Sequence, residues 1–200
     1  MKKVALVIFL SLLFCGCRTC SSGYAEEGGP VKKKIVMIIA QDQFRDEEFF
    51  IPKDIFVKRG VYVSVASTTT GSVKGMLGGE AVPDTLIDNV SPIDFDAVLF
   101  VGGMGASQYW NDPVAHQLIN QANNSNRIVA AICVAPVTLA RAGILKGKRA
   151  TVYSSESNEL IAAGANYTGR EVERDGNIIT ASGPQAAREF AQAVIDALNI

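Results

Sequence analysis

The segment IVAAIC (Ile128–Cys133) is followed by VAP (Val134–Pro136) and then by VTLARAG (Val137–Gly143). Its first six residues form a short apolar run of strand length, and its last seven have the pattern of a helix that ends at glycine. A single cysteine stands where the two patterns meet. This layout predicts a nucleophile elbow, which is a sharp turn from strand to helix that presents one side chain above a sheet.

Two interpretations of Cys133 follow from this segment. At a helix N-terminus, backbone N–H groups and the helix dipole stabilise a thiolate, which would lower the pKa of the thiol and make it a nucleophile. Alternatively, Cys133 is a small buried residue that packs like alanine. The segment alone does not choose between them, so the rest of the chain has to decide.

Strand and helix patterns alternate along the remaining sequence, which predicts an α/β fold with a mostly parallel sheet. Two glycine-containing hairpins interrupt this alternation, one within residues 68–86 and one within 171–180 with its turn at Asp175-Gly176. The expected strands are Ile35–Ala40, Val61–Ser67, Ala97–Val101 and Arg149–Ser154, and the expected helices are Glu47–Arg59, Pro113–Asn123, Ser157–Ala163 and Gln185–Leu198.

The ends of the two longer internal helices carry recognisable signals. Asp46 is a candidate N-cap after a loop at Gln41–Arg45, and Asp112 is a candidate N-cap before Pro113. Pro52 predicts a kink in the first helix. Glu47 and Glu48 stand in the first turn of that helix, where the dipole favours acidic residues whatever their function.

The N-terminal residues have the pattern of an export signal, because Lys2 and Lys3 precede an apolar run too short to span a bilayer. We expect a signal peptide at residues 1–25, a linker at 26–33 and one domain at 34–200. A lipoprotein leader ending near residue 16, with lipid attached to Cys17, is the alternative. Either predicts an exported, periplasmic protein, and membrane contact would occur only through the lipid anchor.

Several classes of function are excluded by composition. Removing residues 1–25 leaves 16 basic and 20 acidic residues, which gives no electrostatic footprint for nucleic acid. It also leaves Cys133 as the sole cysteine, so an internal disulfide is impossible. His116 is the one histidine, which argues against a zinc cluster, and its polar neighbours predict a surface position. The glycines at 102–105 complete no dinucleotide or P-loop motif, so we expect neither a cofactor nor a metal.

Four stretches, taken together, resemble the DJ-1/PfpI family of the class I glutamine amidotransferase-like superfamily. The resemblance covers residues from about Lys34 to Leu198. The stretches are FRDEEFFIP (Phe44–Pro52), VGG (Val101–Gly103), AICVAP (Ala131–Pro136), and the C-terminal pair of VERDG (Val172–Gly176) and IITASGP (Ile178–Pro184) with EFA (Glu189–Ala191).

The resemblance implies a flavodoxin-like three-layer sandwich that forms a homodimer or a higher homo-oligomer. It also implies that Cys133 is the elbow cysteine and that Glu48 contacts it. The backbone N–H groups of Gly103 and Val134 would then form the oxyanion site. A protonated carboxyl beside a thiolate and two N–H donors is chemistry suited to attack on a carbonyl group.

The chain departs from the family pattern where a histidine is usual. Val134 follows the cysteine where the protease-like branch has histidine, and Tyr153 stands where another branch has one. His116 matches neither position. A Cys–His hydrolase mechanism is therefore disfavoured, and Tyr153 is kept only as a candidate for orienting substrate.

We therefore predict a cofactor-independent cysteine enzyme that acts on a small-molecule carbonyl substrate, as a glyoxalase or deglycase does. Cys133 would attack the carbonyl carbon, and Glu48 would shuttle protons. The first alternative is a redox-sensing or chaperone-like protein of the cell envelope, because an exposed thiolate oxidises readily. A cysteine peptidase or amidase of the PfpI type ranks lower, because the adjacent histidine is missing.

Overall fold

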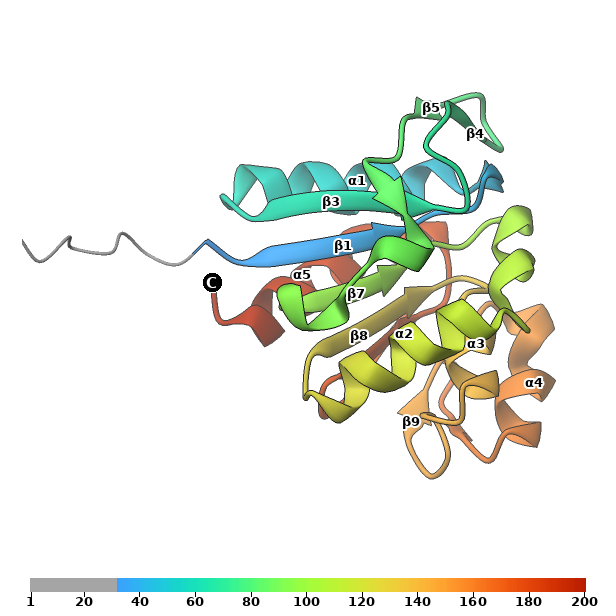
Figure 1. Cartoon of the computed structure of the whole chain (residues 1–200). Helices are drawn as coiled ribbons and strands as arrows, with labels where there is room; N and C mark the ends of the chain where they lie inside the picture. Colours follow the sequence, from blue (N-terminus) through green and yellow to red (C-terminus); the bar gives the residue numbers. More distant parts are fainter. Residues whose placement is uncertain (1–31) are drawn as a thin grey trace, which may run out of the picture. The chain divides into compact units, whose positions relative to one another are not determined.

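A seven-stranded sheet forms the centre of this computed structural model, which describes residues 32–200 (Figure 1). The strand order is β11-β12-β8-β7-β1-β3-β6, and every neighbouring pair is parallel except the hairpin of β11 and β12. The predicted fold class, an α/β fold with a mostly parallel sheet, is therefore confirmed. The strands are β1 (Lys34–Ile38), β3 (Tyr62–Ser67), β6 (Thr85–Leu86), β7 (Ala97–Phe100), β8 (Ile128–Ile132), β11 (Val172–Asp175) and β12 (Ile178–Ala181).

Helices cover both faces of the sheet and complete the three layers (Figure 1). Side chains of β1 explain why its sequence is continuously apolar: Ile35 and Met37 pack into one core, and Val36 and Ile38 pack into the other. On the first face lie α1 (Asp46–Lys58) and α5 (Ala187–Leu198), and on the second lie α2 (Pro113–Asn124), α3 (Pro136–Arg141) and α4 (Ser157–Ala162), with α4 packed against α3.

Shorter elements decorate the ends of the main sheet. A three-stranded sheet is formed by β2 (Asp42–Phe44), β4 (Val73–Gly75) and β5 (Glu80–Ala81), and a two-stranded sheet by β9 (Arg149–Ala150) and β10 (Asn166–Tyr167). The hairpin predicted within residues 68–86 is confirmed as β4 and β5. The 3-10 helices are η1 (Ile87–Asn89), η2 (Pro92–Asp94), η3 (Met104–Tyr109), η4 (Ser154–Glu156) and η5 (Pro184–Ala186).

Three local predictions were wrong. The expected loop at 41–45 contains β2, because Phe44 is buried and Asp42 and Phe44 pair with β4. The strand expected at 149–154 stops at Ala150, after which the chain turns into η4. The N-cap of α1 is Arg45, with Asp46 inside the helix, whereas Asp112 caps α2 as predicted and accepts from the N–H of Val114 at 3.0 Å.

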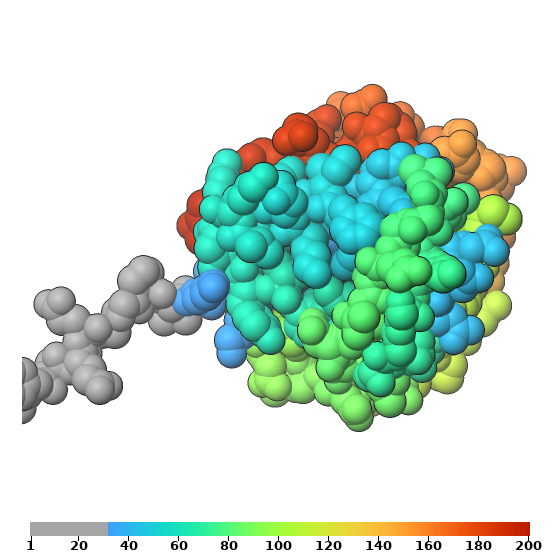
Figure 2. Space-filling view, turned by 90° about the horizontal axis from the view of Figure 1, so that it is seen from above, coloured from blue at the N-terminus to red at the C-terminus, as the bar shows by residue number. Residues whose placement is uncertain are grey.

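The carboxylate of Asp46 fastens the β4–β5 hairpin to the start of α1. It accepts the N–H groups of Leu77 at 2.8 Å and of Gly79 at 2.7 Å. A Cβ at Gly75 would lie 2.5 Å from both carboxylate oxygens, so only glycine allows this close approach. The hairpin lies beside α1 on the surface in Figure 2.

Replacing Asp46 by alanine is expected to release the hairpin while the sheet stays folded. Both hydrogen bonds involve a charged acceptor that is 8% exposed, so their loss weakens local structure by about 1 to 3 kcal/mol. Hydrogen exchange at the amides of Leu77 and Gly79 should accelerate at least about tenfold. Unchanged protection of these two amides would contradict this assignment, and the amides of β1 serve as the internal control.

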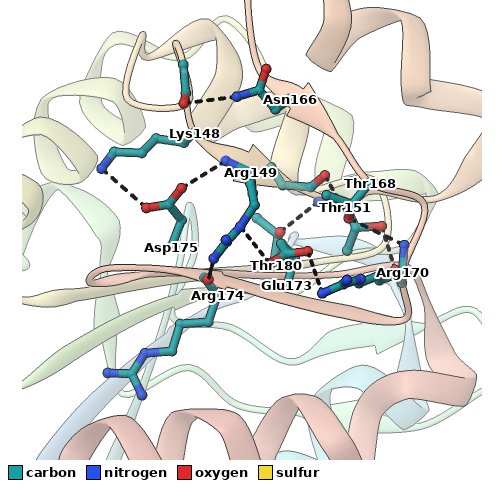
Figure 3. Close-up of polar contacts among 12 residues, drawn as sticks. Lys148, Arg149, Thr151, Asn166, Thr168, Arg170, Glu173, Arg174, Asp175 and Thr180 are labelled. Atoms are coloured by element: carbon teal, nitrogen blue, oxygen red, sulfur yellow. Dashed lines mark hydrogen bonds and ion pairs between the residues drawn. The ribbon is translucent and has the colours of Figure 1, made fainter.

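A cluster of charged and hydroxyl side chains joins the β9–β10 pair to the edge strand β11 (Figure 3). Glu173 stands at its centre with a side chain that is only 4% exposed, and it pairs with Arg149 at 3.2 Å and Arg170 at 3.7 Å. Asp175 accepts from the backbone N–H of Arg149 at 3.0 Å, and this contact lowers the pKa of Asp175. The cluster holds the segment that leads to η4 and Tyr153.

Within this cluster, Arg149→Ala is expected to destabilise the protein more than Glu173→Gln. The arginine side chain is 59% exposed, whereas the glutamate is buried, so removing the arginine leaves a buried carboxylate short of its closest cation. We expect a loss of about 2 to 3 kcal/mol in the free energy of unfolding for Arg149→Ala, measured by denaturant titration. The reverse order of the two variants would refute the argument.

Candidate active site

The candidate site lies where β1, β7 and β8 end at the same edge of the sheet. The order of the strands reverses between β1 and β7, and ligands of open α/β sheets bind in the crevice at such a point. The segment after β1 leads into α1 and carries Glu48, the segment after β7 carries Gly102 and Gly103, and Cys133 follows β8 directly.

Cys133 has the strained backbone that an elbow requires. Its φ is +64°, in the left-handed region that non-glycine residues seldom adopt. Its N–H donates to the carbonyl of Ala181 at 2.9 Å, and its carbonyl accepts from the N–H of Tyr153 at 2.8 Å. The predicted turn between β8 and α3 is therefore confirmed, with a side chain that is 7% exposed.

Glu48 lies entirely inside the protein, so its place in the first turn of α1 does more than complement the helix dipole. Its Oε2 accepts from the N–H of Gly102 at 3.1 Å, while its buried Oε1 has no well-aligned partner among residues 32–200. The thiol of Cys133 is near enough to interact with this carboxyl. A Cβ at Gly102 would lie 2.5 Å from both Glu48 Oε2 and Cys133 Cβ, so glycine makes room for the pair.

Burial controls the protonation of both acids. It raises the pKa of Glu48 to about 8, against smaller opposing effects from Cys133, the Gly102 N–H and Arg45. Burial, together with the nearby Glu48 charge, also raises the pKa of the Cys133 thiol to about 12. The sequence analysis expected helix position to lower the thiol pKa, and this expectation was wrong because burial raises it. Because the two acids interact, they titrate as a coupled pair, and burial favours the state in which both hold their protons.

Two backbone N–H groups reach the sulfur of Cys133. The N–H groups of Gly103 and Val134 both lie near the sulfur and lower the pKa of the thiol, although burial outweighs them. Gly103 adopts a φ of +99°, which glycine tolerates, and it follows directly after Gly102. The structure therefore brings together the four residues that the sequence analysis selected.

A cleft of about 630 Å³ opens above the sulfur. Tyr153, which is 45% exposed, lines it as the sequence suggested, but several other lining residues were missed. Arg45 is one of them, and it forms a two-pronged ion pair with Glu47 at 2.8 and 3.0 Å. The further lining residues that the sequence analysis did not select are Met76, Met104, Ser107, Trp110, Ser155, Glu156 and Pro184.

His116 lies away from this chemistry. It is half-buried, where a surface position was predicted, and its Nε2 bonds to the carbonyl of Trp110 at 2.9 Å. It does not line the cleft. Within residues 32–200, no group of three or more His, Cys, Asp or Glu side chains is placed to bind a metal ion. In the same part of the chain, no helix has the length and apolar character needed to cross a membrane.

The sequence profile of the DJ-1/PfpI family matches residues 33–197. An uncharacterized protein of Methanocaldococcus jannaschii is 43% identical over 203 residues, which cover all of this chain and 98% of the relative. The crystal structure of a ThiJ/PfpI domain protein from Brachyspira murdochii superposes with a TM-score of 0.82 at 36% identity, covering 84% of this chain and 98% of that one.

More distant relatives are named as enzymes. A deglycase from Pyrococcus abyssi is 32% identical, covering 74% of this chain and 90% of its own length. A glutathione-independent glyoxalase from Caenorhabditis elegans is 28% identical, covering 84% of this chain and 90% of its own length. These names describe the relatives, and they indicate the kind of reaction to test here.

Proposed function

The chain belongs to the DJ-1/PfpI family, and from this premise we propose that it is a cofactor-independent cysteine enzyme that acts on small reactive carbonyl compounds. One observation carries the proposal. Cys133 lines the cleft and contacts the buried Glu48, and it stands beside two backbone N–H groups that can stabilise an oxyanion. Such pairs of perturbed acids in clefts are typical of catalytic sites.

In the first step, the sulfur of Cys133 bonds to the aldehyde carbon of a compound such as methylglyoxal. The carboxylate form of Glu48 accepts the thiol proton as that bond forms. The aldehyde oxygen takes the electron pair of its π bond and receives hydrogen bonds from the N–H groups of Gly103 and Val134. Glu48 then returns the proton to this oxygen, which gives a hemithioacetal and restores the carboxylate.

In the second step, Glu48 moves a proton from the former aldehyde carbon to the adjacent carbon through an enediol-like intermediate, and the hydroxyl proton passes to the ketone oxygen. This transfer oxidises the first carbon and reduces the second, so no external oxidant or reductant is needed. Water then cleaves the resulting thioester, which releases a hydroxy acid and regenerates the thiol. In the deglycase version, the same thiol attacks the carbonyl carbon of an early glycation adduct.

The pKa of Glu48 supports its role as a general base. A base works best when its pKa lies near the working pH, and burial places this carboxyl at about 8. Arg45 lines the same cleft, and its positive charge interacts with both acids of the pair. The missing histidine is thus replaced, in this proposal, by the carboxyl group itself.

The alternatives receive less support. A redox sensor uses the same thiol, but it makes no use of the N–H groups of Gly103 and Val134 or of the cleft above the sulfur. A PfpI-type peptidase needs a histidine beside the nucleophile, whereas Val134 follows Cys133 and His116 bonds to Trp110. We therefore rank carbonyl chemistry first.

We further propose export to the periplasm and assembly into a homodimer or a higher homo-oligomer. The signal peptide at 1–25, the lipid attachment at Cys17 and most of the linker at 26–33 lie outside the described residues 32–200. Mass spectrometry of the protein isolated from cells tests the leader: an N-terminus at residue 26 or a lipid on Cys17 supports export, and an intact residue 1 contradicts it.

The direct test of the activity is conversion of methylglyoxal without any added thiol. We expect lactate to accumulate in step with the loss of methylglyoxal, measured by NMR spectroscopy. Because the proposed chemistry uses no cofactor, treatment with a chelator followed by dialysis should leave the rate unchanged. Absence of lactate above the level of a heat-inactivated sample would reject the glyoxalase version, and glycated amino acids would then test the deglycase version.

A further inference from the structure

Trp110 connects the wall of the cleft to the elbow. It follows η3, lies half-buried, and lines the cleft above Cys133. Its indole Nε1–H donates to the backbone carbonyl of Val134 at 3.2 Å. Val134 is the residue whose own N–H reaches the sulfur, so the indole holds the backbone of an oxyanion donor.

Trp110 is itself held from several sides. Its carbonyl accepts from Nε2 of His116 at 2.9 Å, and its N–H donates to the carbonyl of Ser107 at 3.1 Å. The guanidinium of Arg141 lies 5.1 Å from the centre of its ring, within the range of a cation–π contact. Arg141 in turn pairs with Glu159 at 2.9 Å. These contacts restrain the indole in its position next to Val134.

The Val134 carbonyl has one other donor, the N–H of Val137 at 3.3 Å in the first turn of the elbow helix. That bond is long, and α3 is only six residues, so the helix alone restrains the elbow weakly. Anchoring the carbonyl also limits rotation of the adjoining peptide that carries the Val134 N–H. An oxyanion donor contributes to catalysis only when its direction is fixed before the reaction.

We propose that Trp110 is a positioning residue that keeps the N–H of Val134 directed at the oxygen of the reacting carbonyl. The proposal rests on the proposed role of Cys133 as a nucleophile. Trp110 acts through Val134 and makes no contact with the reacting atoms through its indole N–H. It therefore adds a side chain from outside the elbow to a site otherwise built from backbone donors and two acids.

Two reactions of the same thiol separate this role from a merely structural one. With p-nitrophenyl acetate, the sulfur bonds to the ester carbonyl, an oxyanion forms, p-nitrophenolate leaves with its electron pair, and Glu48 takes the thiol proton. With iodoacetamide, the sulfur bonds to a methylene carbon and iodide leaves, so no oxyanion forms. A change in the thiolate fraction alters both rates by the same factor, and the ratio of acylation to alkylation therefore reports the oxyanion site.

In the full-length protein, Trp110→Phe keeps an aromatic ring and removes the N–H. We expect the ratio of acylation to alkylation to fall about tenfold, less than for complete loss of an oxyanion donor. The matched control is Tyr109→Phe in the preceding residue, which removes a hydrogen bond of 2.9 Å to the carbonyl of Ile39, away from the elbow. That control should lower the melting temperature and leave the ratio unchanged.

Wild-type fluorescence provides a second measurement, which does not depend on how the variant folds. Trp110 is the only tryptophan of the chain, so its emission reports this position alone. We expect the emission to shift during acylation by p-nitrophenyl acetate with the same rate constant as p-nitrophenolate release. A Cys133→Ser sample should show neither signal.

The outcomes distinguish this inference from the proposed function. If the wild-type thiol is not acylated, Cys133 is not an activated nucleophile and the proposed function fails first. If it is acylated but Trp110→Phe leaves the ratio unchanged, or lowers it no more than Tyr109→Phe does, only the positioning role is overturned. An emission that stays constant during acylation likewise contradicts the coupling between Trp110 and Val134.

Discussion

Methylglyoxal turnover should fall at least about 10³-fold when Cys133 is replaced by serine, because the reaction then loses its nucleophile. A hydroxyl is far less acidic than a thiol, and the Glu48 carboxylate, with a pKa of about 8, is too weak a base to activate it. The substitution changes one atom at a position that is 7% exposed, so packing is nearly preserved. Lactate formation at saturating methylglyoxal is the measurement.

Thermal unfolding of the Cys133→Ser protein is the control for this result. The melting temperature should stay close to that of the wild type, because the backbone bonds of residue 133 to Ala181 and Tyr153 do not involve the side chain. Equal turnover in a folded serine variant would show that the elbow cysteine is not the nucleophile. It would also support the alternative interpretation, in which Cys133 is a buried residue that only packs in the core.

Glu48→Gln should lower turnover about 10² to 10⁴-fold and flatten its dependence on pH. In the wild type, the coupled pair gains its reactive form by losing one proton, so the rate should rise with pH and level off above about 8, the pKa of Glu48. Glutamine fills the same space without accepting the thiol proton. A variant that keeps the rise near pH 8 would show that another group titrates there.

The same variant should also reveal the cost of burying a carboxylate. The pKa of Glu48 is about 8 in the folded protein and ~4.3 in an unfolded chain, so the folded state retains a proton that the unfolded state releases. This contribution to stability is complete below the unfolded pKa and is lost as pH rises through about 8, by about 1.4 kcal/mol per pH unit. Glu48→Gln has no such loss.

Denaturant titrations between pH 5 and pH 9 measure this effect. The free energy of unfolding of Glu48→Gln, relative to the wild type, should increase from pH 5 to about pH 8 and stay constant above that. Glu173→Gln is the control substitution, because it also replaces a buried glutamate, but one that is paired with two arginines. A wild type whose stability relative to Glu48→Gln is independent of pH would contradict the raised pKa.

Local sequence patterns were sufficient for much of the fold. The strands around Val36, Leu99 and Val129 were predicted because a strand buried on both faces leaves a continuous apolar run. The Asp112 cap was correct because a cap depends only on residues within one turn. Asp46 was misassigned as a cap because its true partners, Leu77 and Gly79, are about thirty positions away in the chain.

At the elbow, too, some features follow from local sequence and others depend on residues that are distant in the chain. The sequence by itself determined that Cys133 stands between a strand and a helix, and family resemblance singled out Glu48, because both signals reside in short ordered stretches. Only the tertiary structure decided the protonation of the pair and the contact of Trp110 with Val134. A pKa depends on every atom that excludes water from a group. The start of α1, the turn after β7 and the end of β12 all lie beside this thiol, so no local pattern encodes its pKa.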